Sequence, residues 1–265
     1  MNQPTERQFF SLPRGFRLAE SAGVPLPLLS LGIFLTYFIV FFAYHNATGS
    51  VTGLRIGERP FWNNPWGFVA FSYAGVWAWL PAFVVLVRRS AQRNLDALRP
   101  SLSSHPSGPG WLGPASARYF RIAGAIGVGT ALAANDWFLP GVASQHRPEA
   151  WEAWSAWSVL HDVVLGWFLW RAWAVALSVA IHFYRLADRG VAVQLLNPRD
   201  LSPFARQGFR LALLFFIGIA IGSPVFGLIP IAQTELFSSV APLVVPGILF
   251  ATLLLYLPCA GAHRA

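Results

Sequence analysis

The sequence predicts an all-α protein that folds as a polytopic membrane bundle of about six transmembrane helices. Hydrophobic residues make up 55% of the 265-residue chain and charged residues only 11%, whereas an ordinary soluble domain has about 25% charged residues. The apolar residues gather in separate runs of about 20 residues, the length that a helix needs to cross the hydrocarbon core. The whole chain, residues 1–265, is therefore expected to form a single integral membrane domain.

Six apolar runs are long enough to span a bilayer. The first follows an N-terminal tail, residues 1–23, and is too long for the apolar part of a signal peptide. The second and third are separated by residues 101–117, whose serine, proline and glycine content is typical of a flexible linker. The fifth follows Ser202-Pro203, the pattern of a helix N-cap and first-turn proline. The predicted spans are Val24–Tyr44, Trp66–Leu86, Tyr119–Phe138, Trp157–Phe183, Phe209–Leu228 and Leu236–Leu257.

The arginines predict the orientation of these spans. The chain has no lysine, and outside the spans fifteen arginines lie in the N-terminal tail, the second and fourth loops and the C-terminal tail. Only three lie in the first, third and fifth loops. Because basic residues accumulate on the cytoplasmic side, both ends of the chain are predicted to be cytoplasmic, in the cell inner (plasma) membrane. This spread of the +8 net charge over the loops also argues against binding of nucleic acid.

Arg171 is the most informative polar residue within a predicted span. It lies about midway along the fourth run, at a depth where a charge costs at least about 2.5–3.5 kcal/mol. Ser178 and His182 fall close to its direction on a helix, so one face of the cytoplasmic half is polar. We interpret Arg171, Ser178 and His182 as an intramembrane polar site for an anion, a proton or an acidic headgroup. The alternative is an arginine that joins helices by binding carbonyl groups.

A second polar cluster is predicted near the outer face. His161 and Asp162 lie near the outer end of the fourth run, and Asp136 ends the third run at a similar depth. These residue types suit a proton relay or a weak metal site. However, adjacent residues on a helix point about 100° apart, and polar residues near water are the simpler interpretation. A haem would need two histidines at one depth on facing helices, for which only His45 and His161 qualify, and it is not predicted. The sequence predicts no metal, cofactor or catalytic residue.

Small residues indicate where helices approach one another closely. Gly218 and Gly222 form a GxxxG pattern, and Ala125, Gly129 and Ala133 repeat every four residues. In lipid, such small-residue faces allow close packing of helix backbones. Both faces are therefore predicted to lie at helix–helix contacts.

Two C-terminal segments carry a resemblance to a known group of proteins. Residues 200–210 (DLSPFARQGFR) and the residues that close the sixth span, Leu257-Pro258 and the GAHR of 261–264, resemble segments of uncharacterised bacterial multi-span integral membrane proteins. In those proteins a charged cytoplasmic helical segment follows. This chain stops at Ala265, so the resemblance implies a shortened or truncated member. It supports the topology and brings no named activity.

Three classes of function are consistent with the sequence. A membrane sensor or anchoring domain is favoured by the basic loops. A transporter or channel for ions or small solutes is favoured by the polar face around Arg171. A membrane-embedded enzyme would use His161, Asp162 and Asp136, but it lacks a nucleophile or metal set, so a non-enzymatic role is preferred. The expected partners are the lipid bilayer, a cytoplasmic protein and a second copy of the chain.

Overall fold

The structure, a computed structural model, describes residue 16 and residues 23–48, 65–98, 116–143, 148–189, 198–228 and 236–262. The regular structure within these residues consists of six helices and no strand. The all-α prediction is therefore confirmed for the described part of the chain. The helices are α2 (Leu26–Thr48), α3 (Pro65–Leu98), α4 (Ala117–Ala143), α5 (Pro148–Arg189), α6 (Pro198–Leu228) and α7 (Leu236–Ala262).

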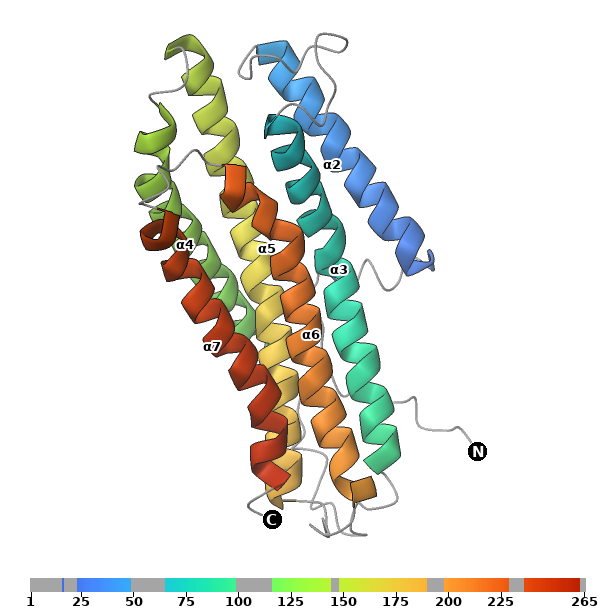
Figure 1. The fold of residues 1–265 in the computed structure, drawn as a ribbon. Helices are drawn as coiled ribbons and strands as arrows, with labels where there is room; N and C mark the ends of the chain where they lie inside the picture. Colours follow the sequence, from blue (N-terminus) through green and yellow to red (C-terminus); the bar gives the residue numbers. More distant parts are fainter. Residues whose placement is uncertain are drawn as a thin grey trace.

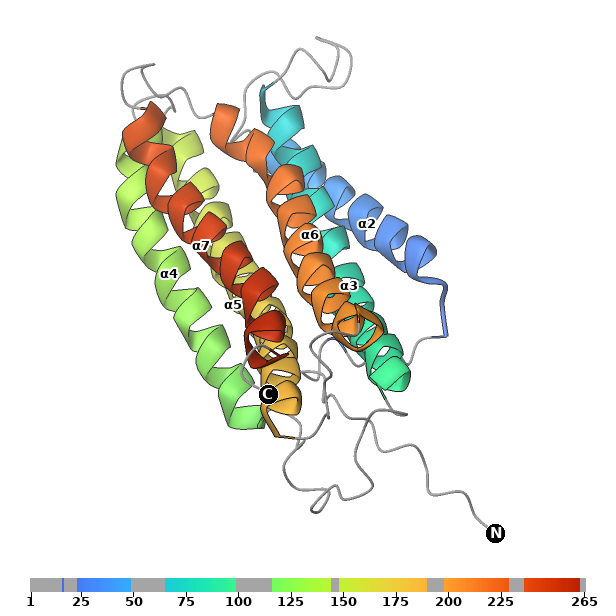
Figure 2. The same cartoon turned by 60° about the horizontal axis from the view of Figure 1, so that its bottom comes forward.

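Successive helices alternate in direction and pack into one bundle (Figures 1 and 2). α3, α5, α6 and α7 form its centre, while α2 packs mainly on α3 and α4 mainly on α5. The shared core contains the fully buried side chains of Val84, Phe183, Leu211 and Leu254, one from each central helix. Because each central helix contributes to the same apolar cluster, a displacement of one helix changes its packing against the other three.

Four of the helices contain segments that are long and apolar enough to cross a membrane. These segments are Leu26–Thr48, Val69–Leu98, Ser155–Leu186 and Ser202–Gly222. The chain is accordingly a helical membrane protein. Four segments of this kind are found among the described residues, whereas six were predicted. The third and sixth runs lie in α4 and α7, whose side chains are described only in part; in α7 the described apolar stretch, Pro246–Ala260, is shorter.

The start of α6 differs from the prediction. The helix begins at Pro198, so Ser202-Pro203 lies inside it and is not its N-terminus. Pro198 itself takes the first helical position, where proline costs no hydrogen bond. The side chain of Arg206 bonds back to Ser202, with Nε donating to the carbonyl oxygen at 3.2 Å and a terminal nitrogen donating to Oγ at 2.8 Å.

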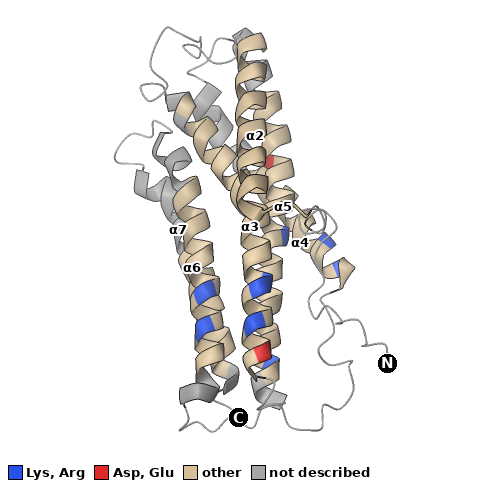
Figure 3. Cartoon of the chain, turned by 90° about the vertical axis from the view of Figure 1, so that its right-hand side faces the viewer, with Lys and Arg blue, Asp and Glu red and all other residues tan. Residues whose placement is uncertain are grey.

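α3 continues as a helix well beyond the predicted end of the second span at Leu86. Its last three turns carry Arg88, Arg89 and Arg93, which therefore lie on a helix and not in a loop. Figure 3 shows that these basic positions and those at the start of α6 gather toward the same end of the bundle. We call this the basic end.

Glycine sets the closest helix contact of α4, but on a different face from the predicted one. A methyl group added at Gly127 would overlap the carbonyl oxygen of Gly166 in α5, so only glycine allows this approach. In contrast, Gly129 has open space around it, and Ala125 and Ala133 are exposed. The prediction that these three small residues line a helix contact is therefore wrong within the described chain.

The second small-residue face lies where it was predicted, at a helix contact. A methyl group added at Gly218 of α6 would lie 3.0 Å from Nε1 of Trp79 in α3. One added at Gly222 would lie 3.4 Å from the Val76 side chain. The α3–α6 contact thus combines small residues on one helix with larger side chains on the other.

Candidate functional site

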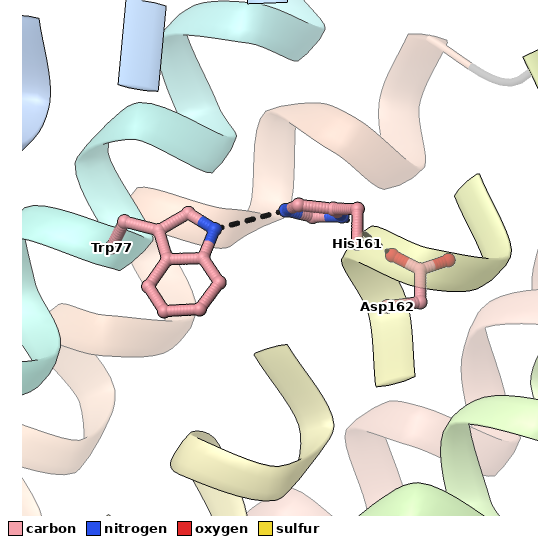
Figure 4. A network of polar contacts seen from close by, with 3 residues as sticks. All are labelled: Trp77, His161 and Asp162. Atoms are coloured by element: carbon pink, nitrogen blue, oxygen red, sulfur yellow. Dashed lines mark hydrogen bonds and ion pairs between the residues drawn. The ribbon is translucent and has the colours of Figure 1, made fainter. Parts of the chain in front are cut away.

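His161 of α5 is buried in the half of the bundle opposite the basic end, and two neighbours hold its ring (Figure 4). Nε1 of Trp77, from α3, donates a hydrogen bond to Nε2 of His161 at 3.0 Å. Oδ1 of Asp162, the next residue in α5, lies 2.9 Å from Nδ1 of His161. The side chain of Asp162 is 29% exposed and that of His161 only 5%, so the carboxylate is the outer member of the group.

Aromatic rings surround the His161 imidazole. The ring of Trp157 lies parallel to it, with the centroids 6.3 Å apart and 4° between the planes. Tyr73 meets it edge-on at 4.3 Å, and Tyr37 lies at 5.4 Å. With Trp77 these residues form an aromatic cage supplied by α2, α3 and α5. Aromatic faces attract a positive charge, and four aromatic rings border this imidazole.

The hydrogen bonds define the protonation of the neutral ring. A tryptophan N–H only donates, so Nε2 of His161 must accept and carries no proton in this arrangement. The proton of the neutral imidazole is then on Nδ1, where it is donated to Asp162. A second proton on Nε2 would place two donors face to face and is incompatible with the bond from Trp77.

Two of the three residues of the predicted outer cluster come together. His161 and Asp162 are in direct contact, with Nδ1 and Oδ1 2.9 Å apart, although the two residues are adjacent on the helix. The side chain of Asp136 lies outside the described residues. Within the described chain, no group of three or more His, Cys, Asp or Glu side chains is arranged to hold a metal ion.

His45 and His161 both pack against the indole ring of Trp157. The centroid of Trp157 is 5.5 Å from the His45 ring and 6.3 Å from the His161 ring. His45 also packs against Phe41, at 4.2 Å. This tryptophan contacts both imidazoles, so the arrangement does not resemble two axial ligands facing a haem.

Arg171 lies on α5 next to α4 and is partly buried. Its guanidinium carbon stands 5.2 Å from the centre of the Trp167 ring, and that ring in turn packs against Gly124 of α4. Nε of Arg171 is buried and has no hydrogen-bond partner among the described residues. The alternative role of Arg171, joining helices by binding carbonyl groups, is therefore not seen in this part of the chain.

The other two residues of the predicted intramembrane site make separate contacts. Oγ of Ser178 donates to the carbonyl oxygen of Val175 in its own helix, at 2.8 Å. His182 is buried, with its ring 6.5 Å from that of Phe183. The three residues share one side of α5, but no hydrogen bond joins any two of them in the described chain.

A polar cluster that the sequence did not suggest lies between α3 and α6. Oε1 of Gln207, which is fully buried, accepts hydrogen bonds from Ser90 Oγ at 3.0 Å and from Asn94 Nδ2 at 2.7 Å. Arg210 reaches the same Ser90 hydroxyl at 3.5 Å. The available signal was the i, i+4 spacing of Ser90 and Asn94 just after an apolar run, which predicts one polar stripe on a helix.

Fold and site together define a helical membrane protein with a buried, aromatic-caged histidine. Comparison of the chain with protein-family models, with curated proteins and with solved structures finds no match.

Proposed function

We propose that the protein is a multi-pass membrane sensor that receives its stimulus at His161 and transmits it to the basic end. The hydrogen bond from Trp77 to Nε2 of His161 carries the proposal. It joins α3 to α5 and exists only while Nε2 is unprotonated. Histidine is the side chain whose charge ordinarily changes between pH 5 and 8. A change in protonation at this site therefore changes a contact between two central helices.

We propose two states of the His161 ring, each with its own contacts. In the neutral state, Trp77 donates to Nε2 and Nδ1 donates to Asp162. In the protonated state, the bond from Trp77 is broken, while the Asp162 carboxylate and the aromatic cage stabilise the positive charge. The other titratable groups that face His161 among the described residues are the phenols of Tyr37 and Tyr73.

A continuous core links the site to the basic end. Phe168 of α5, less than two turns beyond His161, contacts Trp77 with a centroid distance of 5.9 Å. Further along, Val179 and Leu186 of α5 are buried in the same cluster as Val87 of α3. Because close-packed interiors transmit small shifts, a change at Trp77 and His161 is expected to move the basic ends of α3 and α6.

Spin labels at the basic end test this proposal. In a Cys259→Ser background, Ala97→Cys of α3 and Ala205→Cys of α6 place labels on two exposed positions. In lipid vesicles, the distance distribution between the labels should differ between pH 5 and pH 8. His161→Gln should abolish the difference, while His45→Gln, which alters a ring against the same Trp157, should preserve it. Identical distributions in the parent protein, or a response that survives His161→Gln, would refute a sensing role for this site.

The topology proposed with this function has six spans and both ends in the cytoplasm of a bacterial cell. α4 and α7 have 27 residues each, about 40 Å of helix, which is enough to cross the hydrocarbon core. The alternating helix directions and the arginines of the basic end support the same topology. A membrane-impermeant maleimide should label Ala47→Cys in intact cells and Ala97→Cys only after permeabilisation. The reverse pattern would invert the proposed orientation.

A transporter is the second candidate, because Nε of Arg171 is buried without a hydrogen-bond partner among the described residues. A mid-span charge of this kind commonly lies on an ion or proton path. Vesicles loaded with chloride-, phosphate- or proton-sensitive dyes would reveal flux. Arg171→Gln should abolish it without unfolding the protein, whereas unchanged flux would exclude Arg171 from the path.

A further inference from the structure

Four exposed arginines lie together where α3 and α6 meet at the basic end. Arg210 of α6 reaches Ser90 of α3, so the two basic stretches are side by side. Figure 3 shows the basic positions of the two helices at the same level. We call this group the arginine quartet; it consists of Arg89, Arg93, Arg206 and Arg210.

Helix geometry places the quartet on one side of the helix pair. Each of its members immediately precedes a residue buried in the α3–α6 region, namely Ser90, Asn94, Gln207 and Leu211. For two antiparallel right-handed helices, the positions that precede the facing residues by one lie on the same side of the contact. The hydrogen bonds of Ser90 and Asn94 to Gln207 fix the relative height of the two helices behind the quartet.

The four charges of the quartet are only partly balanced, because one described carboxylate, that of Asp96, lies one turn beyond Arg93 on α3. No described carboxylate pairs with any of its members, and the bonds that Arg206 and Arg210 make go to serine oxygens. A guanidinium presents five N–H donors in a planar fork that matches a phosphate. Four such groups on one exposed face therefore favour a phosphorylated anion.

An apolar groove lies on the same face of α3, farther from the basic end. It has a volume of about 330 Å³, and its lining includes Leu26 of α2, Gly75, Ala78 and Ala82 of α3, and Ile221 of α6. Ala82 precedes the first arginine of the quartet by seven residues, so the two share one stripe of α3, about 10 Å apart along the helix.

Exposed apolar side chains indicate that this face lies against lipid. Phe209 of α6, the residue before Arg210, is 60% exposed, and Leu213, almost one turn after it, is 45% exposed. Such residues belong in hydrocarbon, which sets the quartet at the depth of the headgroups. Basic pockets between membrane helices at the cytoplasmic side are suited to anionic lipid headgroups.

We propose that this face binds an anionic phospholipid, with its phosphate at the arginine quartet and an acyl chain in the groove lined by Ala82. The lipid spans both helices and therefore stabilises the α3–α6 contact. The proposal does not depend on the sensor function of His161, because the two sites share no residue.

Lipid binding to the full-length protein tests the proposal. Native mass spectrometry and the thermal unfolding midpoint, measured in detergent with added long-chain phosphatidylglycerol or phosphatidylcholine, should show preferential binding of phosphatidylglycerol. Arg93→Gln/Arg206→Gln should weaken that binding at least about tenfold. The matched control is Arg118→Gln/Arg121→Gln, which removes two exposed arginines from α4 and should change binding less than about twofold. An equal loss of phosphatidylglycerol binding in both double variants would overturn the proposed site.

Two further probes separate the headgroup from the acyl chain and from free phosphate. Inorganic phosphate alone should not raise the thermal unfolding midpoint as phosphatidylglycerol does. An equal rise would identify a free anion as the ligand and overturn the lipid assignment. Ala82→Leu should weaken binding of long-chain phosphatidylglycerol but leave a short-chain form unaffected. Unchanged binding of the long-chain lipid to folded Ala82→Leu would exclude the groove as the acyl-chain site. Circular dichroism on each variant establishes that it is folded.

Discussion

Trp77 and His161 are joined across two helices by a single hydrogen bond, in which the indole Nε1 donates to the imidazole Nε2 at 3.0 Å. This bond leaves the Nδ1 proton for Asp162 and so fixes one tautomer of the neutral ring. A histidine with both nitrogens engaged in this way is oriented by α3 as well as by its own helix. The contact therefore contributes both to the packing of α3 on α5 and to the state of the imidazole.

Loss of the indole donor should destabilise the bundle. Trp77→Phe leaves Nε2 of His161 buried without a partner, and the free energy of unfolding should fall by about 1–3 kcal/mol. Trp79→Phe is the matched control, since Nε1 of Trp79 makes no hydrogen bond with the described residues and the ring change is the same. Denaturant titration in mixed micelles measures both variants. A loss for Trp77→Phe no larger than that of the control would show that the hydrogen bond contributes little.

Two glycines two residues apart should differ in how much stability they lose on substitution by alanine. In Gly127→Ala the new methyl group overlaps the backbone of Gly166, which cannot rotate away, so α4 should be displaced from α5 at a cost of about 1–3 kcal/mol. Gly129→Ala adds its methyl group in open space and should change stability by less than about 1 kcal/mol. Unfolding curves for the pair test this difference. Equal destabilisation would place Gly129 in a contact as well.

The sequence predicted the helices well because apolar run length is a local property. α5 contains the expected span, α2 begins two residues after the predicted start at Val24, and Gly218 lies at a helix contact as its spacing suggested. The contact face of α4 was misassigned because two small-residue stripes compete there, and Gly127 belongs to the one that meets Gly166. Periodicity along one helix does not reveal where the neighbouring helix lies.

The candidate site was predicted only in part for the same reason. His161 and Asp162 were recognised from their depth in an apolar run, but the donor to His161, Trp77, lies 84 residues away in the sequence. An indole in a membrane span is usually interpreted as apolar packing, so its hydrogen bond gives no local signal. Gln207 and Asn94 are likewise 113 residues apart, and their contact follows from the α3–α6 crossing.

Removal of the acceptor at Gln207 should leave two buried hydrogen-bond donors without a partner. Gln207→Leu leaves the Ser90 hydroxyl and the Asn94 amide without their shared acceptor in a buried position, and stability should fall by about 2–4 kcal/mol. Replacing a donor as well, in Ser90→Ala/Gln207→Leu, should recover part of the loss because fewer buried polar groups remain unpaired. Gln92→Leu on the same helix, whose bond to Asp96 is exposed, should change stability by less than about 0.5 kcal/mol.

The measured non-additivity decides whether the cluster acts as a unit. If the double variant is less destabilised than Gln207→Leu alone, the three side chains form one coupled network. If the loss of stability in the double variant equals the sum of the losses in Ser90→Ala and Gln207→Leu, the hydrogen bonds are energetically independent. Gln207 then does not organise the crossing of α3 and α6.

Replacing Arg171 by a neutral residue tests whether its guanidinium stabilises the fold. Arg171→Met keeps an unbranched side chain over Trp167 and removes a mid-span charge that costs at least about 2.5–3.5 kcal/mol. The cation–π attraction between the guanidinium and the indole, which the variant cannot make, is worth about 0.5–2 kcal/mol. The variant should therefore be as stable as the parent, or more stable, in denaturant titrations.

The control for this variant is Arg185→Met, at an exposed position toward the end of α5, which should change stability by less than about 0.5 kcal/mol. A decrease in stability above about 1 kcal/mol for Arg171→Met would instead mean that the guanidinium holds helices together. Only the removal of an attractive interaction between helices could outweigh the desolvation cost that disappears with the charge.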